Sequence, residues 1–169
     1  MMDSKTQRAA FEKMVHQYSE QLYWMIRRMV LSHEDANDLL QNTFLKAWNA
    51  FDTFHGDAKE STWLSRIAIN ECIDFLLRSK QRPVATSDEM SVARTLMADS
   101  YFDGSEAEAL LQEAVASLPD VQRTVFQLRY FEDMKYADMS RLLNTSEGAL
   151  KASYHIAVKK IAAFFKAHD

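Results

Sequence analysis

Three basic side chains share one side of a helical pattern near the end of the sequence, in the segment TSEGALKASYHIAVKKI (residues 145–161). Lys151, His155 and Lys159 recur at four-residue steps, which places them together at 100° per residue. Four apolar residues fall on another side of the same pattern: Leu150, Tyr154, Ala157 and Ile161. One side of the helix can therefore pack against a core while the other contacts phosphates or base edges.

The elements around this segment have the length pattern of a helix-turn-helix, with one helix over residues 135–143 and a second over 146–167. Asn144 tolerates the left-handed conformation that ends a helix, and Ser146 can cap the next one. Gly148 costs about 1 kcal/mol inside a helix, which suggests that something approaches the backbone there. An ordinary helical hairpin with a solvated lysine face explains the same pattern, so the sequence alone leaves both interpretations open.

Titratable residues elsewhere in the sequence show no pattern typical of an enzyme site. An enzyme could use four residues of the first half of the chain as metal ligands: His16, His33, Glu34 or Asp35. Adjacent residues on a helix point in different directions, no His-Glu-x-x-His pattern exists, and no glycine-rich phosphate loop is present. We therefore predict no enzymatic activity, no metal, no cofactor and no small-molecule substrate.

Composition places the chain among helical globular proteins. Of its 169 residues, 47% are hydrophobic and 26% charged, and only 3 are glycine and 2 proline, which favours helices over strands and turns. No apolar run approaches the roughly 18 residues that span a bilayer, and nothing resembles a secretory signal. We expect a cytoplasmic protein without membrane insertion.

The first half of the sequence contains three amphipathic helix patterns, over residues 9–31, 34–51 and 61–80. Ser32 is a plausible cap for the second pattern, and the STW stretch at Ser61 offers one for the third. Apolar spacing predicts that Cys72 and Trp63 are core residues, not a reactive thiol and a stacking platform for bases. These three helices can bury one core.

The second half contains four shorter patterns, over residues 106–117, 119–131, 135–143 and 146–167, with Pro119 suited to a first helical position. Before them, residues 83–105 lack periodicity and read as a linker. Charge is uneven: residues 83–118 hold 1 basic and 7 acidic side chains, residues 59–82 hold 5 and 3, and residues 141–169 hold 5 and 2. The sequence predicts an all-α protein in which a flexible linker joins two small helical domains.

Two ordered motifs then identify a family. EDANDLLQNTFLKAWNAFDTF with GDAKESTWLSRIAINECIDFLLRSKQRP, and later LPDVQRTVFQLRYFEDMKYADMSRLLNTSEGALKASYHIAVKKI, resemble bacterial RNA polymerase sigma factors of the extracytoplasmic-function (ECF) group. The resemblance implies a protein that binds core RNA polymerase and directs promoter-specific transcription initiation. It implies a region 2 domain over residues 1–82, an acidic linker over 83–105 and a region 4 domain with the helix-turn-helix over 106–169.

The resemblance also implies roles for individual residues of the first domain. Three polar residues of the DANDLLQNTF helix would dock on a coiled coil of the polymerase β′ subunit: Asp38, Gln41 and Asn42. Seven residues of the following loop and helix would read the melted −10 element: Phe54, Asp57, Lys59, Ser61, Arg66, Asn70 and Arg78. Of these Asn70 is the best candidate for a base contact, because a carboxamide both donates and accepts.

In the second domain the resemblance places seven residues at the −35 element: Thr145, Ser146, Lys151, Ala152, His155, Ile156 and Lys159. Many family members carry KSRLxRAR where this chain has KASYHIAV, so its −35 preference does not carry over. The resemblance also implies three further partners: the polymerase β flap, promoter DNA and an anti-sigma factor. The acidic linker would either thread a basic channel of polymerase or act as a solvated tether. The alternative is a helix-turn-helix regulator that binds duplex DNA without polymerase; the first domain argues against it.

Overall fold

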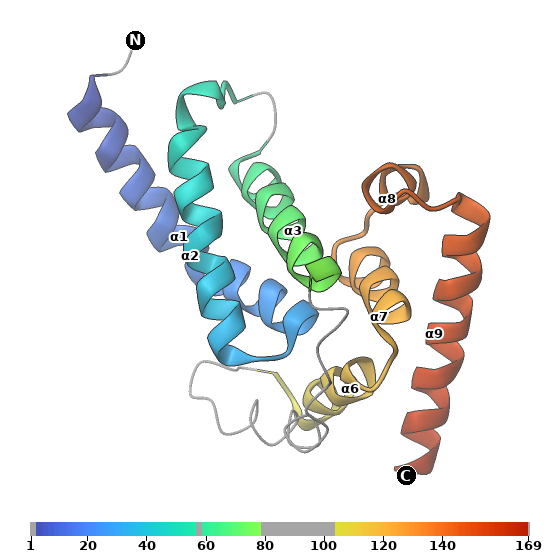
Figure 1. The fold of residues 1–169 in the computed structure, drawn as a ribbon. Helices are drawn as coiled ribbons and strands as arrows, with labels where there is room; N and C mark the ends of the chain where they lie inside the picture. Colours follow the sequence, from blue (N-terminus) through green and yellow to red (C-terminus); the bar gives the residue numbers. More distant parts are fainter. Residues whose placement is uncertain (1–2, 57–58, 79–103, 169) are drawn as a thin grey trace. The chain divides into compact units, whose positions relative to one another are not determined.

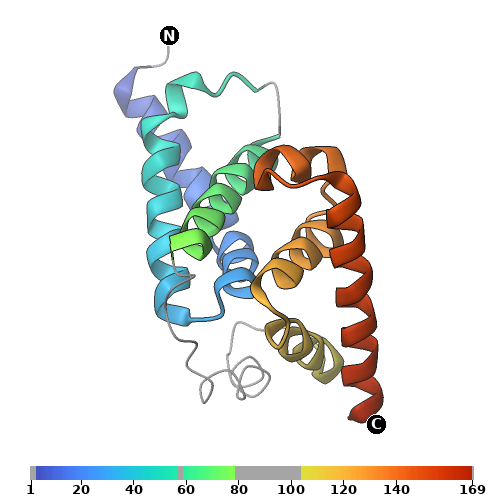
Figure 2. The ribbon, with the colours of Figure 1, turned by 45° about the vertical axis from the view of Figure 1, so that its right-hand side comes forward.

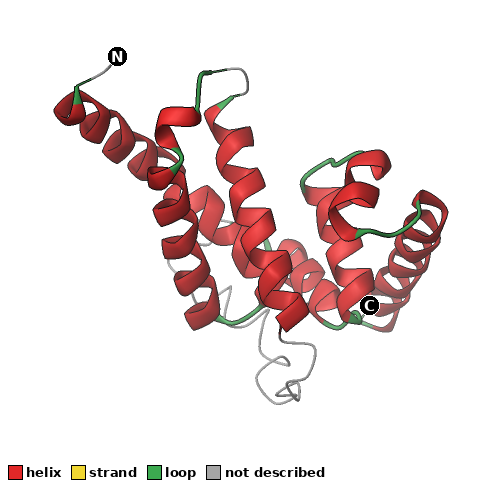
Figure 3. Cartoon of the chain, turned by 45° about the horizontal axis from the view of Figure 1, so that its top comes forward, coloured by secondary structure: helices red, strands yellow, loops and turns green. Residues whose placement is uncertain are grey.

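The structure is a computed structural model that describes residues 3–56, 59–78 and 104–168. Within these residues all regular secondary structure is helical, as Figure 3 shows. The chain divides into two compact units, Met1–Arg82 and Pro83–Asp169. The predicted all-α fold class is confirmed, while the roles assigned to each domain and to the linker remain predictions.

The first unit is a bundle of three long helices that contact one another pairwise (Figure 1). They are α1 (Ser4–Val30), α2 (His33–Asn49) and α3 (Glu60–Arg78), with a short 3-10 turn, η1 (Phe51–Thr53), after α2. Asp3 caps α1 by accepting a hydrogen bond from the Thr6 amide at 2.9 Å, and that backbone bond lowers the pKa of its carboxyl. The predicted helices were right to within a few residues, except that α1 begins five residues earlier.

The core of the first unit consists of aliphatic side chains at helical spacing. Its largest fully buried side chains include Leu22, Ile26, Met29, Leu64 and Cys72. The buried position predicted for Cys72 is therefore confirmed. At one edge of this core Phe11 contacts the rings of Phe44, Trp48 and Phe51 at centroid distances of 5.1 to 6.5 Å.

A strained turn joins α1 to α2. Leu31 has a φ of 69°, and the Ser32 amide donates to the Val30 carbonyl at 2.8 Å, which closes a three-residue γ-turn. The buried guanidinium of Arg27 donates to the Leu31 carbonyl and satisfies the end of α1. Ser32 then accepts from the Asp35 amide at 3.3 Å, so the predicted cap of α2 is confirmed.

The second unit packs its helices against the long last helix (Figure 2). Its elements are α6 (Glu106–Ala116), α7 (Asp120–Phe126), the π-helix η3 (Gln127–Phe131), α8 (Tyr136–Leu143) and α9 (Glu147–Ala167). A buried cluster joins α6, α7 and α9 through Ala114, Val115, Leu118, Phe126, Ala157 and Ile161. This cluster holds α9 in place from its middle turns onward.

Three details differ from the predictions. Pro119 is the residue before α7, with ψ of 154°, and its carbonyl accepts from the Arg123 amide, so it is not the first helical residue. The predicted helix over 119–131 changes at Gln127 from α to π geometry. Ser61 lies inside the first turn of α3, where the Trp63 amide bonds the Lys59 carbonyl, and a residue already inside the helix cannot be its cap.

Candidate nucleic-acid interface

A tight left-handed turn joins α8 to α9. Asn144 has φ 50° and ψ 48°, and its amide bonds the Ser140 carbonyl. Ser146 then caps α9 by accepting from the Ala149 amide at 3.2 Å. Both the turn and the cap were predicted, and both are confirmed, because Asn tolerates positive φ and serine satisfies an amide that the helix leaves free.

The helix α9 has one buried and one exposed face. Leu150, Ala157 and Ile161 are buried with 8% or less of their surface accessible. Tyr154 is half-buried and stacks on Phe126 at 5.8 Å; burial raises the pKa of its phenol above the ordinary value. The residues predicted to face outward are exposed: Lys151, Ala152, His155, Ile156 and Lys159. The division into two faces is thus confirmed, whereas DNA contact by the exposed face remains a prediction.

The start of α9 presents a surface open to a ligand. Thr145 is half-buried and its hydroxyl donates to the Leu143 carbonyl at 3.0 Å, while Ser146 is exposed. A Cβ placed on Gly148 would meet no atom of the described residues within 4 Å. No part of the described protein therefore requires a glycine here, and the close approach predicted from Gly148 would have to come from a bound molecule.

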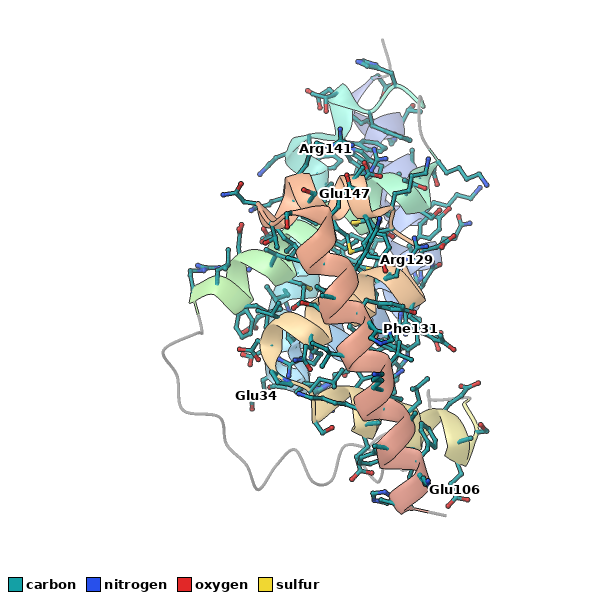
Figure 4. The ribbon with its side chains drawn as sticks, turned by 90° about the vertical axis from the view of Figure 1, so that its right-hand side faces the viewer. Glu34, Glu106, Arg129, Phe131, Arg141 and Glu147 are labelled. Carbon is teal, nitrogen blue, oxygen red and sulfur yellow. The ribbon has the colours of Figure 1, made fainter. Side chains whose placement is uncertain are left out.

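Two residues outside the predicted set lie next to this face. The Arg129 guanidinium lies 4.8 Å from the centroid of the Tyr136 ring, and the Lys151 ammonium lies 5.6 Å from the same centroid. Arg129 also donates to the Met134 carbonyl at 3.1 Å, and Figure 4 labels it in the second unit. Sequence reasoning missed this group because its members come from three elements, η3, α8 and α9, whose contact no spacing rule gives.

The residues predicted at the −10 element lie along the loop before α3 and on α3 itself. Arg66 and Asn70 lie one turn apart on α3. Both are exposed, Lys59 and Arg78 are exposed too, and Ser61 is half-buried. Asp57 lies outside the described residues. The described members of this set follow one helix and its N-terminal end.

Phe54 and Trp63 form one stacked pair in this region. Their ring centroids are 4.8 Å apart at an interplanar angle of 24°, and both side chains are half-buried. Trp63 also contacts Phe51 at 6.4 Å, which ties the pair to the aromatic edge of the core. The prediction that Trp63 packs with the core is therefore confirmed, and the ring of Phe54 covers part of it.

The three residues predicted to bind polymerase, Asp38, Gln41 and Asn42, are all exposed on α2. Asn42 also lines a groove between α2 and α3, together with Leu45, Lys46, Asn49, Glu71, Asp74, Leu77 and Arg78. The buried carboxylate of Glu71 pairs with the Lys46 ammonium and ties the two helices together at this groove. Leu45 and Leu77 are 61% and 57% exposed, and this apolar contribution was missed because helical spacing alone does not separate a buried from an exposed leucine.

The described residues lack two features of other protein classes, a cluster of metal ligands and a membrane-spanning helix. No three His, Cys, Asp or Glu side chains among them come together in a way that could hold a metal ion. The side chains considered for metal ligation, His16, His33 and Glu34, are exposed, and His33 bonds the Tyr23 hydroxyl at 2.6 Å. Among the same residues, no helix has the length and apolar character needed to cross a membrane.

Each of the two units matches a known protein family model. Residues 14–82 match the family model of Sigma-70 region 2, and residues 108–161 match that of Sigma-70, region 4. The chain is 29% identical to the ECF RNA polymerase sigma factor SigW of Bacillus subtilis, over 86% of this chain and 83% of that protein. It is 31% identical to the ECF RNA polymerase sigma factor SigM of Mycobacterium tuberculosis, over 86% and 71%.

A solved structure shares the fold. The sigma factor RpoE of Bartonella quintana, crystallised with the anti-sigma factor NepR, superposes with a TM-score of 0.66 at 24% identity, covering 93% of this chain and 97% of that one. The chain belongs to the sigma-70 family of RNA polymerase sigma factors, in its ECF group. It is a polymerase-binding transcription initiation factor.

Proposed function

We propose that this sigma factor directs promoter-specific initiation through three surfaces: the exposed face of α9 for the −35 element, α3 and the loop before it for the −10 element, and α2 for polymerase. The observation that carries the proposal is the division of α9 into a buried face and an exposed basic one behind a capped left-handed turn. A helix held in this way can enter a major groove without disturbing its own packing.

At the −35 element, Lys151, His155 and Lys159 supply positive charge along one side of α9. Ala152 and Ile156 lie beside them and provide apolar contact for thymine methyl groups. Thr145 and Ser146 lie at the N-terminal end of the helix, where hydroxyls and free amides favour a phosphate. The face has no arginine, which is the usual bidentate reader of guanine, so apolar and lysine contacts would define its preference.

At the −10 element, Arg66, Asn70 and Arg78 offer exposed donors along α3, Lys59 lies just before the helix, and Ser61 lies in its first turn. Asp57 precedes them in the sequence. Asn70 would contact a base edge, because its amide both donates and accepts. The half-buried Phe54, stacked on Trp63, supplies the floor against which an unstacked base would lie.

Polymerase would dock on α2 through Asp38, Gln41 and Asn42, against the β′ coiled coil, and the second unit would contact the β flap. Charge reversal by Asp38→Lys should abolish capture of core polymerase without unfolding the protein, because Asp38 is exposed and takes part in no ion pair among the described residues. Glu20→Lys, an equal charge change at an exposed position of α1, is the matched control. Equal capture by wild type and Asp38→Lys would argue against this docking surface.

Regulation by an anti-sigma factor follows from the same surfaces. Solved structures of similar fold include the sigma factor RpoE in a co-crystal with the anti-sigma factor NepR, and CnrH in complex with the cytosolic domain of CnrY. Such a partner would mask exposed faces of both units, with the acidic segment over residues 83–105 joining them. The protein would then act in the cytoplasm, where polymerase and promoters are.

Run-off transcription with core polymerase over a library of promoter fragments tests the proposal directly. Transcripts should start at a small group of promoters that share −10 and −35 sequences, and only when both the protein and core polymerase are present. The alternative, a regulator that binds duplex DNA alone, predicts that the pure protein shifts the same fragments without polymerase. A shift of that kind without any transcript would favour the alternative.

A further inference from the structure

Two cations of the second unit share one aromatic ring. The Cζ atom of Arg129 lies 4.8 Å from the centroid of the Tyr136 ring, and the Nζ atom of Lys151 lies 5.6 Å from it. Both distances are within the roughly 6 Å at which the negative face of an aromatic ring attracts a cation. Tyr136 is the first residue of α8, half-buried, whereas Lys151 is exposed on α9.

The two cations differ in how firmly they are held. Arg129 is half-buried and donates to the Met134 carbonyl at 3.1 Å, which fixes it to the loop between η3 and α8. The Met134 amide in turn donates to the Leu128 carbonyl at 2.9 Å, so both backbone polar groups of Met134 are hydrogen-bonded. Among the described residues, the Lys151 ammonium contacts only the Tyr136 ring. The Tyr136 ring therefore contacts one cation that is also hydrogen-bonded to the backbone and one that is exposed.

We propose that Tyr136 is a positioning residue for −35 recognition: its ring, itself held against Arg129, orients the Lys151 side chain on the DNA-facing side of α9. A free lysine side chain loses much rotamer freedom when it binds, and a lysine already held by a ring loses less. Arg129 carries the same charge as Lys151, so the attraction of the ring for the ammonium acts against the repulsion between the two cations. The inference rests on the proposed −35 role of Lys151.

The ring and not the hydroxyl carries this role, and the two can be separated. Tyr136→Leu removes the ring, and the loss of an exposed cation–π contact should weaken binding to −35 DNA by about two- to fivefold. Tyr136→Phe keeps the ring and should restore affinity to within about twofold of wild type. Tyr130→Leu is the control, because Tyr130 is an exposed tyrosine of the same unit with rings, not cations, as its described partners.

The experiment measures binding of holoenzyme to a promoter selected from a pool randomised over the −35 segment, with a scrambled −35 fragment as reference. Wild type, Lys151→Ala, Tyr136→Leu and the double variant form a cycle. The expected result is that Tyr136→Leu has little further effect once Lys151 is alanine, while the thermal transition of each variant matches that of its parent. Equal losses in both backgrounds would overturn the inference.

The remaining outcomes separate the inference from the proposed function. Should Lys151→Ala leave −35 binding unchanged, the placement of Lys151 at DNA is wrong and the inference falls with it. Should Lys151→Ala weaken binding while Tyr136→Leu does not, only the inference fails. A loss in Tyr136→Phe as large as that in Tyr136→Leu would assign the effect to the hydroxyl and overturn the positioning role.

Discussion

Ser146 combines two roles that substitution can separate. Its hydroxyl caps α9, with the Ala149 amide at 3.2 Å, and its exposed position at the start of the recognition helix places it near DNA phosphates in the proposed complex. Aspartate caps helices about as well as serine and adds a negative charge, whereas alanine removes the cap and adds none. Ser146→Asp should therefore keep the fold and weaken −35 binding, and Ser146→Ala should weaken the fold.

The magnitudes follow from the geometry. Loss of the cap in Ser146→Ala should cost about 1 kcal/mol, which corresponds to a fall of about 4–8 °C in the melting temperature of a unit of this size. A carboxylate about 5 Å from a phosphate in water costs about 0.8 kcal/mol, or about a fourfold loss of DNA affinity at low salt. That loss should shrink as salt rises, because the Debye length falls to about 8 Å at physiological ionic strength.

Two probes separate stability from binding. All three tryptophans lie in the first unit, so tryptophan fluorescence follows that unit while circular dichroism follows both. Ser146→Ala should shift a dichroism transition and leave the tryptophan transition in place. DNA affinity is measured with holoenzyme on a −35 fragment at two salt concentrations.

Ser105 provides a matched control within the same unit. It caps α6 through the Glu108 amide, also at 3.2 Å, and lies outside the predicted DNA face. Ser105→Asp makes the same charge change at an equivalent cap and should leave −35 affinity unaltered. The reasoning is refuted if Ser146→Asp binds −35 DNA as tightly as wild type at low salt, or if both aspartate variants weaken binding equally.

Two further predictions concern α9. Because burial raises the pKa of Tyr154, the folded state holds the phenolic proton more tightly than the unfolded chain does. The contribution of this proton to the stability of the folded state is therefore complete below about pH 10 and is lost as the pH rises through the folded pKa. Tyr154→Phe should therefore lose less stability than wild type between pH 9 and 11 in urea unfolding, and parallel curves would contradict this. Gly148→Ala should raise the melting temperature of the second unit, because alanine gains up to about 1 kcal/mol in helix propensity and no described atom obstructs a Cβ here. The same substitution should weaken −35 binding if DNA approaches this backbone. Unchanged binding would remove Gly148 from the interface.

Local rules were enough to predict most of the helices and the caps. Ser32, Asn144 and Ser146 occupy the predicted cap and turn positions because each satisfies backbone groups a few residues away. The buried face of α9 followed from helical spacing in the same way, since the burial of Leu150, Ala157 and Ile161 repeats with the turn. Family resemblance then supplied the function, which the described fold alone does not specify.

Contacts between distant segments were decided only by the tertiary structure. The pairing of Lys46 with Glu71, the stacking of Phe54 on Trp63, and the gathering of Arg129 and Lys151 at Tyr136 each join residues of different elements. Periodicity shows which side of a helix is apolar, but it does not show which residues of other elements contact the remaining sides of that helix. That depends on how helices cross and on where each side chain finds space, as at Gln127, where α7 continues into a π-helix. The sequence by itself therefore determined most of the helices, the caps at Ser32 and Ser146, the turn at Asn144 and the family, whereas packing determined which side chains meet.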